Sequence, residues 1–160
     1  MKRWIILAAA MLLAGCSQVE APLTGEEIAS LFVGDHTAVV ELTAGNLEMT
    51  ADLTRTGSMT EVSITSPEHL RGLRFTPDGI RFGELSAVGE MPAASVGAAL
   101  DEVMDAISFG ELQPDENGSV RGCCGGGSYL LMTENGQPLS LELPAFDLKM
   151  QYIKYNSSNI

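Results

Sequence analysis

Apolar and polar residues alternate with a period of two over much of this chain, and this alternation most constrains its fold. From Asn46 to Arg55 the apolar side chains fall on one face, and the same pattern recurs in residues 38–42, 58–65, 139–143 and 146–152. Successive side chains of a β-strand point to opposite faces, so each segment predicts a strand with one buried face. The sequence therefore predicts a sheet that covers a core on one side.

Short turn sequences separate the predicted strands. Residues 44–46 (Ala-Gly-Asn), residues 76–79 (Thr-Pro-Asp-Gly) and Asn135-Gly136 are typical of tight turns, and short strands at residues 73–75 and 80–82 flank the second of them. Strands joined by tight turns run antiparallel. We therefore expect an antiparallel sheet, with a further strand at residues 129–132.

Two segments follow a helical period instead. Thr24 and Glu27 have the spacing of a capping box, and a short apolar stripe follows and ends at Gly34. A longer stripe of Val96, Leu100, Val103 and Ile107 lies after Met91-Pro92. Its acidic residues fall elsewhere on the helical wheel and predict a solvent-exposed outer surface, formed by Asp101, Glu102 and Asp105.

The order of these elements predicts the fold class α+β. We expect the two helices to cover the apolar face of the sheet, which is the only extended apolar surface available to their stripes. By length the chain holds one such domain, at residues 24–156, followed by a frayed tail at residues 157–160.

The N-terminus has the pattern of a secretion signal. Lys2 and Arg3 precede an apolar run at residues 4–13, which is shorter than the roughly 20 residues that span a bilayer. The run ends in Leu-Ala-Gly before Cys16, which resembles the lipobox of bacterial lipoproteins. That resemblance implies a cleaved signal peptide at residues 1–15, a lipid anchor on the Cys16 thiol, and a tether at residues 16–23. The protein is then expected in the cell envelope, on the extracytoplasmic side of a membrane.

Charge limits the partners of the mature chain. Residues 16–160 contain all 21 acidic residues but only seven of the nine basic ones, which gives a formal charge of −14. So acidic a surface disfavours nucleic acid, whose phosphates require Lys and Arg. It also disfavours a polybasic membrane patch. We therefore expect membrane contact through the lipid on Cys16.

Several stretches resemble the lipoprotein-carrier superfamily (the LolA-like and LppX/LprG-like group). They are residues 64–75 (Ile-Thr-Ser-Pro-Glu-His-Leu-Arg-Gly-Leu-Arg-Phe), residues 77–82 (Pro-Asp-Gly-Ile-Arg-Phe) and residues 135–139 (Asn-Gly-Gln-Pro-Leu). The resemblance implies a strongly curved antiparallel sheet, an unclosed half-barrel whose concave face is covered by helices. It also implies an apolar cavity for acyl chains. Since this mature chain is shorter than most members of the group, a core with no cavity is the alternative.

The adjacent Cys123 and Cys124 precede three glycines. Three interpretations stay open: a flexible Gly-rich hairpin loop in which small residues are tolerated, a vicinal disulfide with a structural role, or a redox or metal site. Adjacent cysteines alone do not supply the four ligands of a zinc site. No metal or cofactor is predicted.

Catalytic signatures are weak. His36 follows Asp35 and could serve a hydrolase, and His69 lies near Ser66, but no G-x-S-x-G motif supplies a nucleophile. Asp115-Glu116-Asn117-Gly118 is only a fragment of a calcium loop. We therefore expect a protein that is not an enzyme.

Two functions remain. The first is a membrane-anchored protein whose curved sheet binds or shields a lipid or acyl chain. The second is a structural or interaction lipoprotein with a filled core, presenting an acidic face to a protein partner. For the first, the candidate cavity residues come from the apolar rows and are Leu47, Met49, Leu53, Val62, Ile64, Leu100, Val103, Leu141, Leu148 and Met150.

Overall fold

The computed structural model describes residues 22–83, 85–87, 94–125 and 127–157. These residues form one antiparallel sheet in the order β6-β5-β4-β3-β2-β1-β10-β9-β8-β7. The strands of the first half are β1 (His36–Ala44), β2 (Leu47–Thr56), β3 (Met59–Ser66), β4 (Leu73–Thr76), β5 (Gly79–Phe82) and β6 (Leu85–Ala87). Those of the second half are β7 (Ser119–Cys124), β8 (Gly127–Glu134), β9 (Gln137–Leu143) and β10 (Leu148–Ser157).

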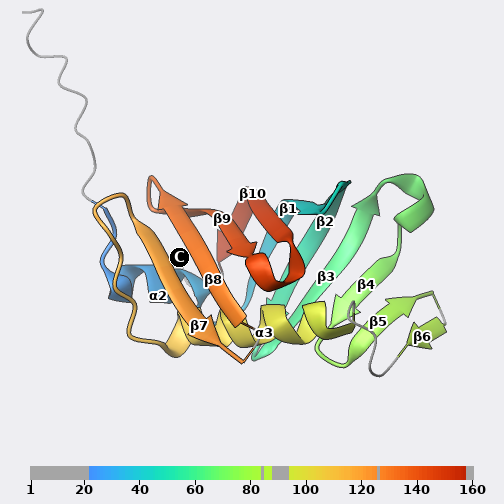
Figure 1. Ribbon diagram of the computed structural model, residues 1–160, viewed down its shortest axis with the longest axis horizontal. Coiled ribbons are helices and arrows are strands. Elements are labelled where there is room, and N and C mark those ends of the chain that lie inside the picture. The colour runs from blue at the N-terminus through green and yellow to red at the C-terminus, as the bar shows by residue number, and fades with distance from the viewer. Residues whose placement is uncertain (1–21, 84, 88–93, 126, 158–160) are drawn as a thin grey trace, which may run out of the picture.

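The sheet is curved and does not close, because β6 and β7 are its two edges and do not pair with each other (Figure 1). Each half is a meander of consecutive strands, and β1 joins the halves by pairing with β10. Two helices, α2 (Gly25–Phe32) and α3 (Ala94–Phe109), complete the α+β fold. The predicted fold class, an unclosed curved antiparallel sheet with two helices, is confirmed.

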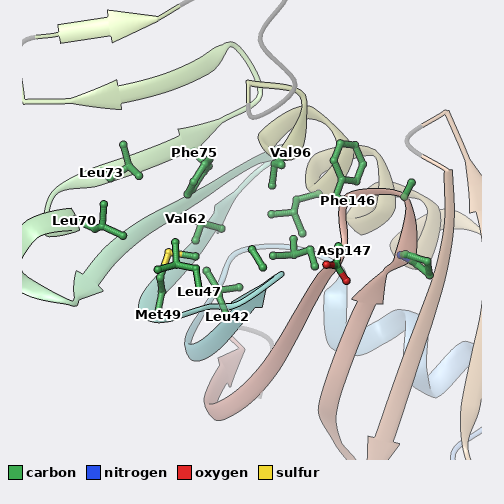
Figure 2. A pocket seen from close by; sticks show the side chains of 15 residues that line it. Leu42, Leu47, Met49, Val62, Leu70, Leu73, Phe75, Val96, Phe146 and Asp147 are labelled. Carbon is green, nitrogen blue, oxygen red and sulfur yellow. The ribbon is translucent and has the colours of Figure 1, made fainter.

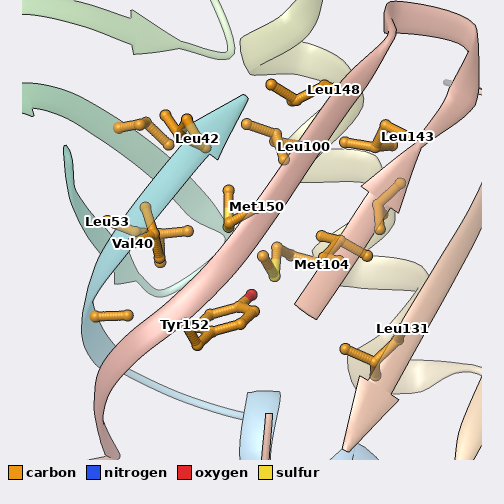
Figure 3. Packing of buried hydrophobic residues seen from close by; sticks show 14 of the residues in the cluster. Val40, Leu42, Leu53, Leu100, Met104, Leu131, Leu143, Leu148, Met150 and Tyr152 are labelled. Carbon is orange, nitrogen blue, oxygen red and sulfur yellow. The ribbon is translucent and has the colours of Figure 1, made fainter. Parts of the chain in front are cut away.

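The core lies between the concave face of the sheet and the helices. Alternate residues of the strands supply it, as the period of two predicts, and Figure 3 shows side chains of β1, β9 and β10 packed toward Leu100 and Met104 of α3. The buried cluster draws on both helices and on strands of both halves of the sheet. The described part of the chain therefore has one shared core and folds as one unit.

Helix α2 begins and ends on specific hydrogen bonds. The Thr24 hydroxyl accepts from the Glu27 amide at 3.3 Å, and the Thr24 amide donates to the Glu27 carboxylate at 2.8 Å. This confirms the predicted capping box. At the other end, Ser108 of α3 donates to the Phe32 carbonyl at 2.9 Å, and the Tyr155 hydroxyl of β10 donates to the Leu31 carbonyl. These two C-terminal carbonyls of α2 are thus satisfied by neighbouring elements.

Helix α3 connects the two edges of the sheet, since it follows β6 and precedes β7. Along the way it contacts β3, β4, β5 and β7. Its approach to β4 is close at Gly97, where a Cβ would lie 2.1 Å from the carbonyl oxygen of Thr76. Only glycine allows this separation of the two backbones.

Arg55 links α3 to the sheet. Its side chain is 1% exposed and continues the apolar row of β2. The guanidinium donates to the Thr60 hydroxyl at 2.8 Å and pairs with Asp101 at 3.5 Å and with Asp105. Asp101 also accepts from the Thr60 amide at 2.7 Å.

The predicted solvent-exposed role of the helix carboxylates is therefore wrong for Asp101, which is 20% exposed, and incomplete for Asp105, which is 45% exposed but also pairs with a buried base. Asp101 and Asp105 form ion pairs with the buried Arg55, whereas Glu102 is exposed as expected. The prediction failed because a helical wheel shows which residues face away from the apolar stripe, but not that a buried base lies beside it.

The Gly-rich segment also differs from the loop interpretation. Cys123 and Cys124 end β7 and pair with Ser128 and Gly127 of β8, so the segment is a strand pair rather than a long loop. Both thiols are free; Cys123 is exposed and the Cys124 thiol lies 3.7 Å from the Gly127 carbonyl oxygen. Successive strand residues point to opposite faces, which holds the two sulfurs apart. The vicinal disulfide is not formed in this structure.

Cys16, the signal segment and most of the tether lie outside the described residues, as do residues 158–160 of the predicted tail. Within the described part, neither helix has both the length and the apolar character needed to cross a bilayer.

Candidate ligand cavity

A cavity of about 600 Å³ opens on the concave side of the sheet. It lies between four parts of the fold: the end of the β1–β2 hairpin, the inner faces of β3 and β4, the first half of α3, and the turn before β10 (Figure 2). Fourteen of its fifteen lining residues are apolar, and they are Leu42, Ala44, Leu47, Met49, Val62, Leu70, Leu73, Phe75, Val96, Leu100, Pro144, Ala145, Phe146 and Leu148. The fifteenth is Asp147.

The cavity arises because the helices cover only part of the apolar face. Toward α2, the inward row of β2 is fully buried at Leu53. Toward the hairpin with β1, the same row reaches Met49 and Leu47, and Leu47 is 41% exposed. At that end of the hairpin, apolar side chains that would otherwise form core therefore surround a hollow.

The turn before β10 forms one wall. The sequence predicted a strand from Phe146, but Pro144–Phe146 is a short 3₁₀ helix, η2, and Asp147 adopts a left-handed conformation with φ 49°. The Asp147 amide donates to the Pro144 carbonyl at 3.1 Å, and the Asp147 carbonyl accepts from the Gly45 amide at 3.2 Å. These bonds hold the Phe146 side chain against the cavity and set the Asp147 carboxylate at its edge (Figure 2).

The predicted cavity residues divide into two groups. Five of them line the cavity: Leu47, Met49, Val62, Leu100 and Leu148. The other five are buried in the core and do not line it: Leu53, Ile64, Val103, Leu141 and Met150. The alternation assigned the eight strand residues to the inner face of the sheet, and the helical stripe assigned Leu100 and Val103 to the side of the helix that covers it. All ten lie on those faces, but neither pattern shows which part of the sheet a helix covers.

Ten lining residues were not among the predicted ones. Leu42, Leu73, Phe75, Val96 and Phe146 belong to the apolar patterns of the predicted elements and could have been proposed on that ground. Leu70, Ala44, Pro144, Ala145 and Asp147 lie in turns or at strand ends. The first four carry no periodic signal, and Asp147 falls on the outward phase of the predicted strand at residues 146–152, so only the folded chain reveals these five.

The candidate catalytic histidines have other surroundings. His69 is exposed. His36 is 2% exposed and packs edge-on to Phe32 and at a tilt to Tyr155, with ring centroids 5.9 and 5.3 Å away. Its Nδ1 lies 3.2 Å from the Gly34 carbonyl oxygen, which can only accept, so Nδ1 carries the proton. The Asp35 carboxylate accepts instead from the Gly57 amide at 2.8 Å.

Burial lowers the pKa of His36, and the nearby Arg55 charge acts in the same direction. The unfolded state, with a His pKa of about 6.5, then binds more protons than the folded state. The contribution of neutral His36 to the free energy of unfolding is therefore complete above that pH. It is lost as the pH falls below it, by up to about 1.4 kcal/mol per pH unit. Urea unfolding at pH 7.5 and at lower pH should show this slope in the wild type and in His69→Gln, but a smaller slope in His36→Gln. Equal slopes in all three chains would contradict the assignment to His36.

A second hollow and a search for metal-ligand clusters give no stronger candidate for a functional site. A polar hollow of about 500 Å³ is lined by Glu41, Leu42, Thr43, Glu48, Met49, Thr50, Ser66 and Gln151. Within the described ranges, no three His, Cys, Asp or Glu side chains gather as they would around a metal ion. The apolar cavity is therefore the site with the clearest chemical character.

Comparisons with known proteins give similarities of fold. No protein-family model matches the chain, and no curated protein matches it. Several solved structures are similar to it. An uncharacterized conserved protein from Thermus thermophilus has a TM-score of 0.47 at 10% identity, covering 96% of this chain and 89% of that chain.

A DUF1329 family protein from Desulfovibrio piger has a TM-score of 0.42 at 10% identity, covering 84% of this chain and 92% of that one. A LolA superfamily protein from Nitrosomonas europaea has a TM-score of 0.37 at 9% identity, covering 86% of this chain and 95% of that one.

Proposed function

We propose that this chain is a lipid-anchored, non-enzymatic protein of a bacterial cell envelope that binds the apolar chain of a lipid in its cavity. The observation that carries the proposal is the cavity itself. Its volume falls within the range of small-molecule sites, roughly 300–1,000 Å³, and its lining is apolar except for Asp147. Filled cores do not leave an open apolar hollow of this size, so the cavity favours ligand binding over the filled-core alternative.

The chemistry of the lining selects a hydrocarbon ligand. Burying a methylene group contributes about 0.8 kcal/mol, so each added methylene should tighten binding about fourfold until the cavity is full. The wall also includes the thioether of Met49, a flexible side chain that adapts to ligands of different shape. Such a site is expected to distinguish ligands by chain length.

Two measurements test this proposal together. Native mass spectrometry of the chain purified from a lipid-containing host should show a co-purifying lipid mass. Fluorescence displacement with saturated fatty acids of increasing length should show affinity that rises with length and then reaches a plateau. Absence of a lipid mass, together with affinities independent of chain length, would contradict the proposal.

Placing a charge in the cavity should weaken fatty-acid binding strongly without unfolding the protein. Leu47 lines the cavity and is 41% exposed, so Leu47→Glu costs little stability but puts a carboxylate beside the ligand. We expect at least about tenfold weaker fatty-acid binding. Met59→Glu is the matched control, because Met59 is 56% exposed and does not line the cavity. Equal affinities for the two variants would place the ligand elsewhere.

The anchor is supported by the sequence alone, through the apolar run at residues 4–13 and the Leu-Ala-Gly before Cys16. Two or more acyl chains hold a protein at a membrane, whereas one gives reversible binding. Cells grown with an alkyne fatty acid should therefore label the full-length chain. Cys16→Ser should remove the label, while the double variant Cys123→Ser, Cys124→Ser should keep it. A label that survives Cys16→Ser would contradict the anchor.

A further inference from the structure

The apolar lining of the cavity continues toward the open edge of the sheet. Leu73 lines the cavity, and it is paired across β4 and β5 with Phe82, which is paired in turn across β5 and β6 with Leu85. Residues paired directly across an antiparallel sheet lie on the same face. Phe82 and Leu85 therefore extend the concave, cavity-lining face as far as the edge strand β6. Strands β5 and β6 lie beyond β4 at this edge of the sheet (Figure 1).

These two side chains are unusually exposed for their size. Phe82 is 46% exposed and Leu85 is 75% exposed. Among the other exposed large apolar side chains of the described residues, Leu47 lines the cavity, whereas Val33, Met59, Phe109 and Ile153 do not. We call Phe82 and Leu85 the β5–β6 apolar edge. It is distinguished by its continuity with the apolar lining of the cavity.

The charge of the chain is unevenly distributed around this edge. Residues 68–87 contain three arginines (Arg71, Arg74, Arg81) and three acidic residues, so this segment is neutral. The rest of residues 16–160 contains four basic and 18 acidic residues, and so carries the whole charge of −14. An anionic lipid surface repels the acidic remainder of the domain and repels this segment least.

Two arginines of the segment lie on the strands at this edge of the sheet, Arg81 on β5 and Arg74 on β4. Arg81 separates Ile80 from Phe82 on β5, and it is paired with Arg74 on the opposite, outward face. Arg71 and Arg74 are more than half exposed and form ion pairs with Glu68 and Glu61. Arginine at the border of an apolar surface can reach lipid headgroups while its stem stays against hydrocarbon. A second copy of the chain would present no such headgroups.

The geometry points to the β5–β6 apolar edge as the surface that touches the lipid bilayer, and through which a lipid chain passes between the bilayer and the cavity. The contact with the bilayer stands independently, but the passage of the chain rests on the proposed function. The edge thus gives the protein a second contact with the membrane, in addition to the proposed lipid anchor on Cys16, and this contact fixes the orientation of the domain. This contact is apolar rather than polybasic, and it turns the mouth of the cavity toward its ligand.

The experiment uses the chain from residue 22 onward, which contains the shared core and lacks both the apolar N-terminal run and Cys16. Vesicles of phosphatidylcholine with phosphatidylglycerol carry a pyrene-labelled fatty acid, and stopped-flow fluorescence follows its transfer to the protein. The edge variant is Phe82→Ser, Leu85→Ser, with Leu85→Ser alone as a milder version. The control is Phe109→Ser, Ile153→Ser, which removes comparably exposed apolar side chains from other places.

We expect vesicle-to-protein transfer to slow about tenfold or more in the edge variant, because two apolar contacts with the bilayer are lost. Binding of the same fatty acid added in solution should stay within about twofold of the wild type. The control should match the wild type in both assays. Equal transfer rates for the edge variant and the wild type would overturn the inference, and so would a wild-type dimer that becomes monomeric in the edge variant.

A failure of the proposed function gives a different result. If neither the wild type nor any variant binds the fatty acid in solution, the cavity does not bind acyl chains. Co-sedimentation of the unloaded protein with vesicles then decides the contact alone: loss of sedimentation only in the edge variants supports it, and equal sedimentation of all variants overturns it.

Discussion

Replacing Arg55 with alanine should lower the free energy of unfolding by about 3 kcal/mol. The guanidinium is 1% exposed and joins β2 to α3 through Asp101 and Asp105, and it also donates to Thr60. Its removal leaves two carboxylates without their base and a hole beneath the helix. Because Asp101 and Asp105 are 20% and 45% exposed, water relieves part of this loss and keeps it from being larger.

Urea unfolding at pH 7.5 measures the effect, with two comparisons. Asp105→Ala should cost about 1 kcal/mol, since that carboxylate already contacts solvent. Glu102→Ala should stay within about 0.5 kcal/mol of the wild type, because Glu102 lies on the same helix and is exposed. If Arg55→Ala and Glu102→Ala cost the same, Arg55 does not hold α3 to the sheet.

The second large effect is expected at Gly97, where alanine should destabilise the protein although it favours helices. In an open helix the change from glycine to alanine gains about 1 kcal/mol. Here the added Cβ would meet the Thr76 backbone at 2.1 Å from its oxygen and 2.6 Å from its carbon. Backbone cannot rotate away as a side chain can, so α3 must move off β4. We expect a net loss of about 2 kcal/mol.

The sign of the change is the test. Ala98→Gly, one residue further along α3, should also destabilise, by about 1 kcal/mol, through helix propensity alone. Thermal unfolding should therefore show a lower melting temperature than the wild type for both variants, although one replaces glycine with alanine and the other replaces alanine with glycine. Val96 and Leu100 flank Gly97 and line the cavity, so Gly97→Ala should weaken fatty-acid binding as well. A more stable Gly97→Ala variant would contradict the close approach of α3 to β4.

The sequence predicts most of the sheet because alternation is a local property. The inward positions of β1 and β10, such as Val40, Leu42 and Met150, follow directly from a period of two, and Asn135-Gly136 has the positive φ angles that its turn requires. Strand β6 was not predicted, since three residues are too few to show a period. The strand at Ser119–Cys124 was missed because it lies largely within the Gly-rich residues 120–128, a composition typical of loops.

Contacts between distant parts of the chain explain the remaining differences. Arg55 falls in phase with Met49, Ala51 and Leu53, and a base in an apolar row could have suggested a buried ion pair, but not that its partners lie on α3. Likewise, Leu53 and Met49 share one face of β2, yet the first is core and the second lines the cavity. That difference depends on how far the helices extend over the sheet, which no local pattern records.

The most direct test of the central claim is a crystal structure of the protein with a fatty acid brominated at its terminal carbon. Anomalous scattering locates bromine independently of the surrounding density. We predict a bromine peak within the cavity bounded by Val62, Phe75, Leu100 and Phe146, with the Leu47→Glu variant lacking it. A peak elsewhere on the protein, or a cavity filled by its own side chains at the same ligand concentration, would contradict the account.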